Sequence, residues 1–177
     1  RLAPYRIETL VTLRKGARWV EFETKINNNV PNHYLQAAFP TDVDAEFVYA
    51  QGQFDVVKRP IAKPDYSKYD EIPMTEQPMN SFVDICNENE GAAILNTGLK
   101  AYESDDDYNH TVYLSLLRCF ELRIYVTPEE QNYSRIENGS QSFGEHTFRY
   151  AFMPHKGDWE DAQVWKAAED FNMEILI

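Results

Sequence analysis

The sequence predicts a mainly β protein, an antiparallel β-sandwich with one short helix near the C-terminus. About nine or ten short segments alternate apolar and polar side chains with the period of two that is typical of half-buried strands. Glycine, proline, asparagine and aspartate gather between these segments, as they do in turns. Because 43% of the 177 residues are hydrophobic, the chain can bury one sizeable core, and we expect residues 1–177 to form a single domain.

The first two segments predict an antiparallel hairpin with one buried face. Lys15 and Gly16 supply the turn between them. We expect the apolar residues of both strands to face the core, because polar residues occupy the alternate positions. The apolar positions are Tyr5, Ile7, Val11 and Leu13 before the turn, and Val20, Phe22 and Ile26 after it.

Further strands are expected at residues 34–39, 47–49, 54–57, 82–86, 92–95, 111–118 and 146–152. Pro40 and Pro154 are expected to end the strands that precede them, because proline cannot donate to a ladder. Residues 58–80 contain four prolines, and we expect a long surface excursion there that covers another surface. The acidic run 105–107 is expected to be a solvated loop.

A helix of about three turns is expected near the C-terminus. Asp158 can cap it, with Asp161 near the positive end of the helix dipole. The residues that follow at helical spacing are Ala162, Trp165, Ala168 and Phe171.

Charge and cysteine content limit the partners and the compartment. Seventeen basic and 29 acidic side chains give a formal net charge of −12, which repels phosphate backbones and anionic lipid, so we expect no nucleic acid and no membrane partner. No apolar stretch reaches the roughly 20 residues of a membrane-spanning helix. Cys86 and Cys119 both lie in apolar runs, where a thiol is usually buried, and this favours a reducing compartment.

The motifs of several enzyme classes are missing from the sequence. It contains no GxSxG, P-loop, HExxH or CxxC motif. Acids are numerous but scattered, whereas a glycosidase needs two carboxylates at a set separation. Asp55 and Arg59, near a probable bend at Gly52, form either a cross-strand ion pair on the solvent face or part of a site. We therefore expect no catalytic residue and no metal ligand on this chain.

Four longer motifs carry a family resemblance. Their order and separations are similar to those of segments in bacterial members of glycoside hydrolase family 38: YAQGQFDVVKRP, SFVDICNENEGAAILNTGLKAYE, TVYLSLLR and FGEHTFRYAFMPHKGDW. The resemblance covers nearly the whole chain. It implies a galactose-mutarotase-like supersandwich from the C-terminal half of a retaining α-mannosidase. It also implies that the nucleophilic aspartate and the zinc ion of the parent enzyme lie in an N-terminal domain, outside this chain.

In the family, loops of the β-region contribute a tyrosine and an arginine to substrate contacts near the zinc. The matching loops VYAQGQFD and SLLR imply the substrate-contact candidates Tyr49, Gln53, Asp55, Arg59 and Arg118. The implied partners are the N-terminal and helical domains of the parent enzyme and a mannose-containing glycan. We expect a bacterial cytoplasmic enzyme, of which this chain is an inactive fragment with an exposed apolar patch, first sought in residues 58–80.

Two other functions stay open at this stage. A free-standing carbohydrate-binding or structural sandwich would need exposed aromatic residues along one sheet. A mutarotase-like sugar epimerase would use His146 or His155 with Glu145 as acid and base, with Asp158 as an orienting carboxylate. An open cleft lined by these residues would favour the epimerase, and burial of the histidines against the terminal helix would count against it.

Overall fold

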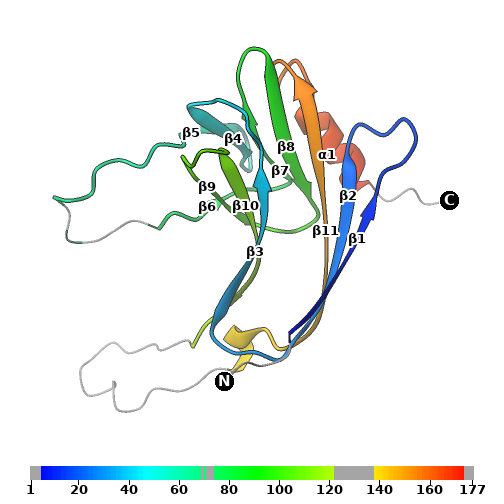
Figure 1. Ribbon diagram of the computed structural model, residues 1–177, viewed down its shortest axis with the longest axis vertical. Coiled ribbons are helices and arrows are strands. Elements are labelled where there is room, and N and C mark those ends of the chain that lie inside the picture. Colours follow the sequence, from blue (N-terminus) through cyan, green and yellow to red (C-terminus); the bar gives the residue numbers. More distant parts are fainter. Residues whose placement is uncertain (1–4, 69, 71–73, 122–137, 174–177) are drawn as a thin grey trace.

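The computed structural model consists of two antiparallel sheets that face each other and one helix on the outer side of the larger sheet (Figure 1). It describes residues 5–68, 70, 74–121 and 138–173. The predicted fold class, a mainly β antiparallel sandwich with a helix near the C-terminus, is confirmed.

The larger sheet has seven strands, in the order β1 (Arg6–Thr12), β2 (Val20–Asn28), β11 (Gly144–Lys156), β8 (Glu90–Asn96), β7 (Phe82–Cys86), β4 (Phe47–Gln51) and β5 (Val56–Pro60). The smaller sheet has four, in the order β3 (His33–Pro40), β10 (Thr111–Cys119), β9 (Ala101–Ser104) and β6 (Gln77–Pro78). A 3-10 turn, η2 (Asn138–Gln141), precedes β11, and the helix α1 (Val164–Asn172) follows it. β6 and β9 were not predicted, because two and four residues are too short to show a period.

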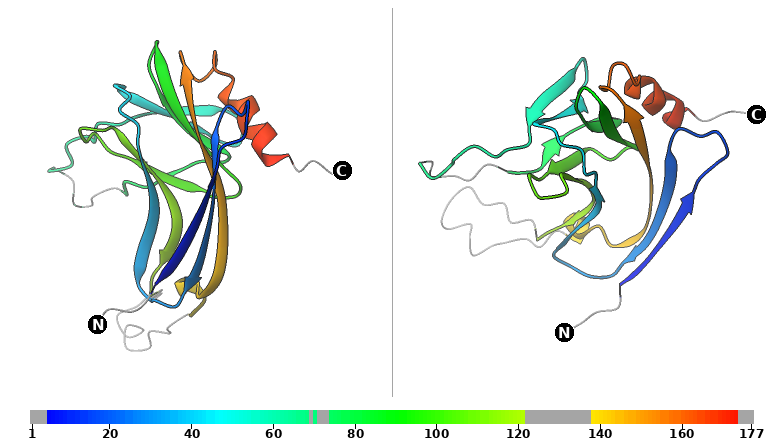
Figure 2. Two further views of the ribbon diagram at one scale, coloured as in Figure 1. Left: turned by 45° about the vertical axis from the view of Figure 1, so that its right-hand side comes forward. Right: turned by 45° about the horizontal axis from the view of Figure 1, so that its top comes forward.

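The core lies between the two sheets and takes alternate residues from each strand. Its fully buried members include Val83, Ile94, Val112 and Leu114. Aromatic rings of β2, β3 and β11 meet in this core, where Phe39 packs edge-on against Phe22 and Tyr150 and parallel to Phe152. The residues between these core positions are buried as well on β7 and β8, because the helix covers the other face of the larger sheet (Figure 2).

The helix forms as predicted but presents a different face to the sheet. Its buried residues are Val164, Ala167, Ala168 and Phe171, which pack on Phe82, Ala93, Leu95, Ala151 and Met153. Of the residues that were expected at helical spacing, Ala168 and Phe171 are buried, whereas Trp165 is 42% exposed. Asp158 caps a preceding turn, where its Oδ1 accepts from Asp161 N at 2.8 Å. Gln163, with φ 51°, separates this turn from α1 and shifts the helical stripe.

Three strand predictions also differ from the structure. Phe54 lies in the turn between β4 and β5 and is fully exposed, because β5 begins only at Val56. Pro154 does not end its strand, β11. The pairing of β11 with β2 ends at Phe152, so no strand lies on that side of Pro154 to need its missing N–H, while the pairing with β8 continues to Lys156. The hairpin β1–β2 is confirmed, but the apolar residues of β1 are exposed rather than buried.

The loops between strands are held by side chains. The excursion 58–80 leaves the larger sheet with β5 and joins the smaller sheet at β6. The acidic run is not simply solvated: Asp105 pairs with Lys63 at 3.2 Å, and Asp107 accepts from the backbone N–H and hydroxyl of Thr111, which lowers the pKa of Asp107. Both cysteines are buried free thiols, as predicted.

One ionisable pair is buried on the helix side of the larger sheet. His155 Nε2 lies 2.7 Å from Asp84 Oδ2, and the two side chains are 5% and 0% exposed. Burial opposes protonation of the imidazole, but the hydrogen bond and the charge of Asp84 outweigh it and raise the pKa of His155. The pair joins β7 to the end of β11, which are separated by β8.

Gly91 makes room for this pair. A Cβ at Gly91 would lie 2.3 Å from His155 Cε1 and 2.6 Å from Cys86 Cβ. We predict that Gly91→Ala lowers the free energy of unfolding by about 1–3 kcal/mol, the range for overpacked cores. Gly139→Ala is the matched control, because a Cβ there meets nothing within 4 Å. Urea unfolding of both variants tests this, and equal stabilities would contradict it.

The buried pair also predicts a pH dependence. The folded-state pKa of His155 is raised above its unfolded value of about 6.5. Its contribution is therefore fully present below pH about 6.5 and is lost as the pH rises through the folded pKa. The free energy of unfolding, measured with urea at a series of pH values, is expected to decline over this range. His155→Gln and Asp84→Asn are each expected to flatten the decline, and a variant that keeps it would refute this assignment.

Candidate functional site

The five candidate residues lie in three separate places. Gln53 and Asp55 lie in the turn after β4 and face the residues that lead into α1, and Tyr49 on β4 packs against one of those residues, Trp159. Arg59 lies on β5, and Arg118 lies on β10 in the other sheet. The structure therefore assembles three of the five candidates and leaves the two arginines elsewhere.

The first place is an open cleft of about 530 Å³ between the β4–β5 turn and residues 159–165. Gln53, Phe54 and Asp55 line one side of it, and Trp159, Glu160 and Trp165 line the other. Below them Tyr49 packs against Trp159, with 6.2 Å between ring centroids. The cleft thus combines aromatic rings with carboxylates and an amide.

The β4–β5 turn is fixed by hydrogen bonds that involve its own residues. Gly52 N donates to Asp55 O at 2.7 Å, and Asp55 Oδ1 accepts from Val56 N at 2.8 Å. Asn80 Nδ2 donates to Gly52 O at 2.7 Å and ties the turn to the segment before β7. This fixed backbone leaves the ring of Phe54 fully exposed at the tip of the turn.

The opposite wall of the cleft rests on the core of the larger sheet. Trp159 packs on Phe82 at 6.4 Å between ring centroids, so only part of its indole is exposed. Trp165 stands on the first turn of α1 with 42% of its surface exposed. Tyr49 pairs in register with Asp84, which places the buried Asp84–His155 pair in the same part of the sheet as the base of the cleft.

The geometry suits the binding of a polyol. Exposed aromatic rings can stack on the C–H faces of a sugar, and carboxylates and amides can bond to its hydroxyl groups. The sequence prediction missed Phe54, Trp159, Trp165 and Asp84 as parts of this region. One signal was present for Asp84, an acid in the middle of the apolar run FVDIC, because such a buried charge needs a partner.

Arg59 joins the two sheets instead of pairing with Asp55. Its Nη1 donates to Tyr102 Oη at 3.1 Å and to Pro78 O at 3.3 Å. Burial raises the pKa of Tyr102, although the hydrogen bond and charge of Arg59 oppose this. The alternative of a cross-strand ion pair between Asp55 and Arg59 is therefore wrong, because Arg59 reaches across to the smaller sheet.

Arg118 belongs to a polar cluster on the outer face of the smaller sheet. Its Nη1 donates to Glu76 Oε2 at 2.9 Å. Glu76 Oε1 accepts from Tyr34 Oη at 2.8 Å and from Ser115 Oγ at 2.7 Å. Burial and the charges of Glu76 and Glu103 raise the pKa of Tyr34. Both arginines thus hold the segment 74–78 against the smaller sheet.

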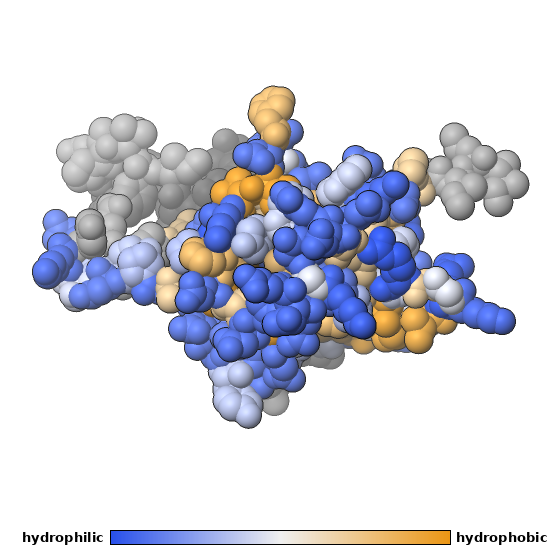
Figure 3. Space-filling view, turned by 90° about the horizontal axis from the view of Figure 1, so that it is seen from above, coloured by the Kyte–Doolittle hydropathy of each residue, from blue (hydrophilic) through white to orange (hydrophobic). Residues whose placement is uncertain are grey.

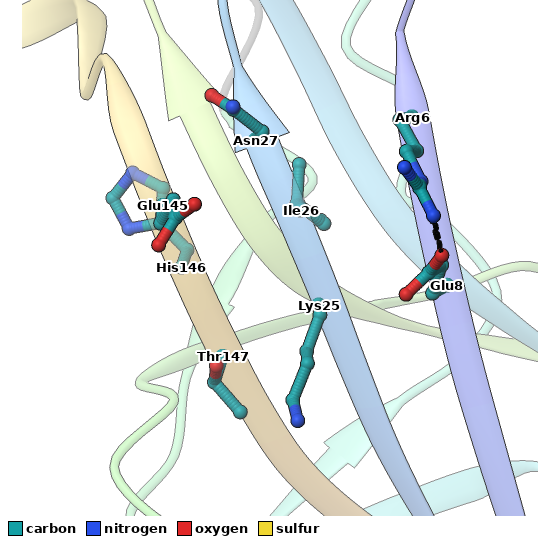
Figure 4. A pocket seen from close by; sticks show the side chains of 8 residues that line it. All are labelled: Arg6, Glu8, Lys25, Ile26, Asn27, Glu145, His146 and Thr147. Atoms are coloured by element: carbon teal, nitrogen blue, oxygen red, sulfur yellow. Dashed lines mark hydrogen bonds and ion pairs between the residues drawn. The ribbon is translucent and has the colours of Figure 1, made fainter.

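The residues of the proposed epimerase site are not brought together. Figure 4 shows Glu145 and His146 on β11, at a shallow pocket that crosses to β2 and β1. As neighbours on a strand they point to opposite faces, and His146 Nε2 bonds to Ser142 O at 2.7 Å. His155 lies nine positions further along β11, about 30 Å away at the usual rise per residue, and it is buried with Asp84 rather than in a cleft.

The described residues contain no group of three or more His, Cys, Asp or Glu side chains that could hold a metal ion. Within this part of the chain, the donor set that zinc requires is therefore not present. In the same residues, no helix has the length and apolar character needed to cross a membrane.

Comparison with known proteins gives the family. The model of the glycosyl hydrolases family 38 C-terminal domain matches residues 2–121. A Halalkalibacterium halodurans protein, named as a candidate mannosylglycerate hydrolase, is 29% identical over 97% of this chain and 18% of its own length. Human alpha-mannosidase 2C1 is 28% identical over 97% of this chain and 14% of its own.

A solved structure matches as well. The crystal structure of an alpha-mannosidase from Enterococcus faecalis superposes with a TM-score of 0.83 and 29% identity, over 98% of this chain and 18% of that one. The chain thus spans less than a fifth of each of these relatives. Since the family model matches more than half of the 177 residues, the chain belongs to glycosyl hydrolase family 38 and carries its C-terminal domain.

Proposed function

We propose that this chain is the C-terminal β-domain of a larger enzyme that hydrolyses α-mannosidic bonds, and that it supports and partly lines the active site. The match to the Enterococcus faecalis alpha-mannosidase carries this proposal, because it extends over 98% of this chain but only 18% of that protein. The single domain, 1–177, would then be one part of a longer polypeptide. Its partners would be the N-terminal and helical domains of that polypeptide and a mannose-containing glycan.

The contacts of two acids, Asp84 and Glu76, support a non-catalytic role for them. Retaining glycosidases place two carboxyl groups about 5–5.5 Å apart on either side of the scissile bond. Here Asp84 is buried against His155, and Glu76 is bound by Arg118, Tyr34 and Ser115. We propose that the nucleophile and a zinc ion are supplied by the rest of the enzyme.

The cleft at the β4–β5 turn is the part of this domain that we assign to glycan contact. Gln53 and Asp55 line it together with two tryptophans, Trp159 and Trp165, and Tyr49 packs against Trp159. Arg59 and Arg118 form hydrogen bonds within the domain. They act by positioning the segment 74–78. The rings would stack on the sugar while Asp55 and Gln53 bond to its hydroxyl groups.

The surface favours this role over a free-standing sugar-binding module. Such a module needs exposed aromatic residues along one sheet. The exposed aromatic residues in the described part of the chain are dispersed over strands, loops and the helix. They are Tyr34, Phe54, Tyr108, Phe120, Phe143 and Trp165. Seen from above, hydrophilic side chains predominate and apolar ones emerge in small groups (Figure 3).

We further propose a cytoplasmic location for the enzyme. The two buried free thiols, Cys86 and Cys119, support it. Proteins of oxidising compartments tend to pair their cysteines, whereas cytosolic proteins keep them reduced.

The main test compares the complete polypeptide with residues 1–177 in the hydrolysis of an aryl α-mannoside, with and without a zinc chelator. We predict activity only in the complete polypeptide, and loss of that activity with the chelator. The reason is that the nucleophile and the zinc ion are proposed to come from the rest of the enzyme, and the described residues of the fragment contain no group that could hold a metal ion. Activity in the fragment alone would overturn the proposal.

A second test addresses the cleft. In the complete enzyme, Asp55→Asn and Trp165→Ala are each predicted to lower kcat/KM roughly tenfold, the effect of losing one charged hydrogen bond or one ring contact of about 1.4 kcal/mol. Asp106→Asn is the control, because Asp106 lies in an exposed loop outside the cleft. If all three variants match the parent enzyme, the cleft does not contact substrate.

A further inference from the structure

The first hairpin holds the largest group of exposed apolar side chains among the described residues. We expected such a patch in the excursion 58–80, whose described residues contribute only Met74 to the exposed large apolar side chains. On β1 and the residue that follows it, four are exposed, by 44%, 63%, 56% and 71%: Ile7, Leu10, Val11 and Leu13. Free exposure of so many apolar groups on one strand indicates a surface that is normally covered.

Two of these residues lie on the core side of the larger sheet. Ile7 pairs in register with Ile26, and Val11 pairs with Phe22. Paired residues in an antiparallel ladder point to the same face. Ile26 is buried and Phe22 packs against the core, so Ile7 and Val11 extend the core surface by one more strand.

They are exposed because the smaller sheet, in its described part, has no strand that covers them. β3 is its last strand on this side, and it packs through Phe39 on Phe22, Tyr150 and Phe152. These residues belong to β2 and β11. At its first residue β3 does reach the start of β1, since His33 Nε2 lies 3.0 Å from the hydroxyl of Tyr5, but further along it leaves Ile7 and Val11 exposed. The right-hand view of Figure 2 shows the β1–β2 hairpin at the rim of the molecule, beyond β3.

The free edge of β3 is built to accept another strand. Among the described strands β3 pairs only with β10. Its eight residues, HYLQAAFP, include no Asp, Glu, Lys or Arg, although natural edge strands usually carry charges that prevent pairing. The edge strand of the larger sheet has this protection, since Arg6 and Glu8 form an ion pair on β1.

We propose that a further antiparallel strand docks on the free edge of β3 and covers Ile7 and Val11 with its inward side chains. A strand lies about 4.8 Å from its neighbour, and two packed sheets lie about 10 Å apart. One strand added beside β3 therefore comes to lie over the outer strands of the larger sheet. The occupant is an extended segment with apolar residues at alternate positions.

A second copy of the chain does not fit this edge. Antiparallel pairing of two β3 strands requires a two-fold axis perpendicular to the sheet. Both larger sheets then lie on the same side of the joined sheet. Because each extends past its own β3 by β1, β1 of one copy would collide with the larger sheet of the other.

The occupant is a strand of the same polypeptide, outside these 177 residues. Relatives in which this chain spans only 14% to 18% of the length have ample polypeptide to provide it. The source of the strand rests on the proposed function, whereas the docking edge rests on β1 and β3 alone.

Hydrogen exchange of the backbone amides of β3 tests the inference. In the 177-residue chain, the amides that point away from β10 are expected to exchange rapidly. In the complete polypeptide their exchange is expected to be slower by at least roughly tenfold, because the added strand protects them. Equal exchange in both proteins would overturn the inference.

Two neighbouring substitutions on β1 separate strand docking from general protection. In the complete polypeptide, Val11→Lys is expected to restore rapid exchange in β3, because a charge would face the apolar side of the docked strand. Leu10→Lys is the matched control, because Leu10 is similarly exposed, by 63% against 56%, but points to the opposite face. Equal effects of the two substitutions would refute the inference. If the complete polypeptide protects the β3 amides but does not hydrolyse an aryl α-mannoside, only the proposed function is refuted.

Discussion

The need to cover the larger sheet on both faces determines the arrangement of this domain. β7 and β8 carry apolar side chains toward the smaller sheet and also toward α1. Burial of each large apolar side chain contributes about 1.5–3 kcal/mol, so both covers are required. The polypeptide that leads from β11 to α1 passes the β4–β5 turn, and Trp159 and Trp165 form the cleft there. The candidate site is thus a consequence of how the second face is buried.

Much of the fold could be predicted from the sequence, because most strands are half-buried and show a clear period of two. The errors arose where burial depends on distant elements. The exposure of Val11 follows from a smaller sheet that has four strands in the described part of the chain, which no local pattern reveals. Pro154 continues β11 because the neighbouring strand has ended. Trp165 is exposed because a left-handed residue, Gln163, resets the helix register.

The site was only partly predictable. Tyr49, Gln53 and Asp55 are close in sequence, so their meeting at one turn required no tertiary information. The tryptophans that complete the cleft come from more than 100 residues away, and only the fold brings them there. The two arginines were placed in loops by resemblance, but they lie on strands with partners of their own. A motif match reports sequence similarity and does not show which way a side chain points.

The anchoring of the excursion 58–80 has an evolutionary consequence. The segment leaves one sheet at Pro60 and enters the other at Gln77, and Arg59 bonds to Pro78 O where the two ends meet. Since doubling the length of a flexible loop adds only about 0.6 kcal/mol of closure entropy, insertions between these anchors are nearly neutral for folding. Insertions there can therefore change this part of the surface while the two sheets keep their alignment.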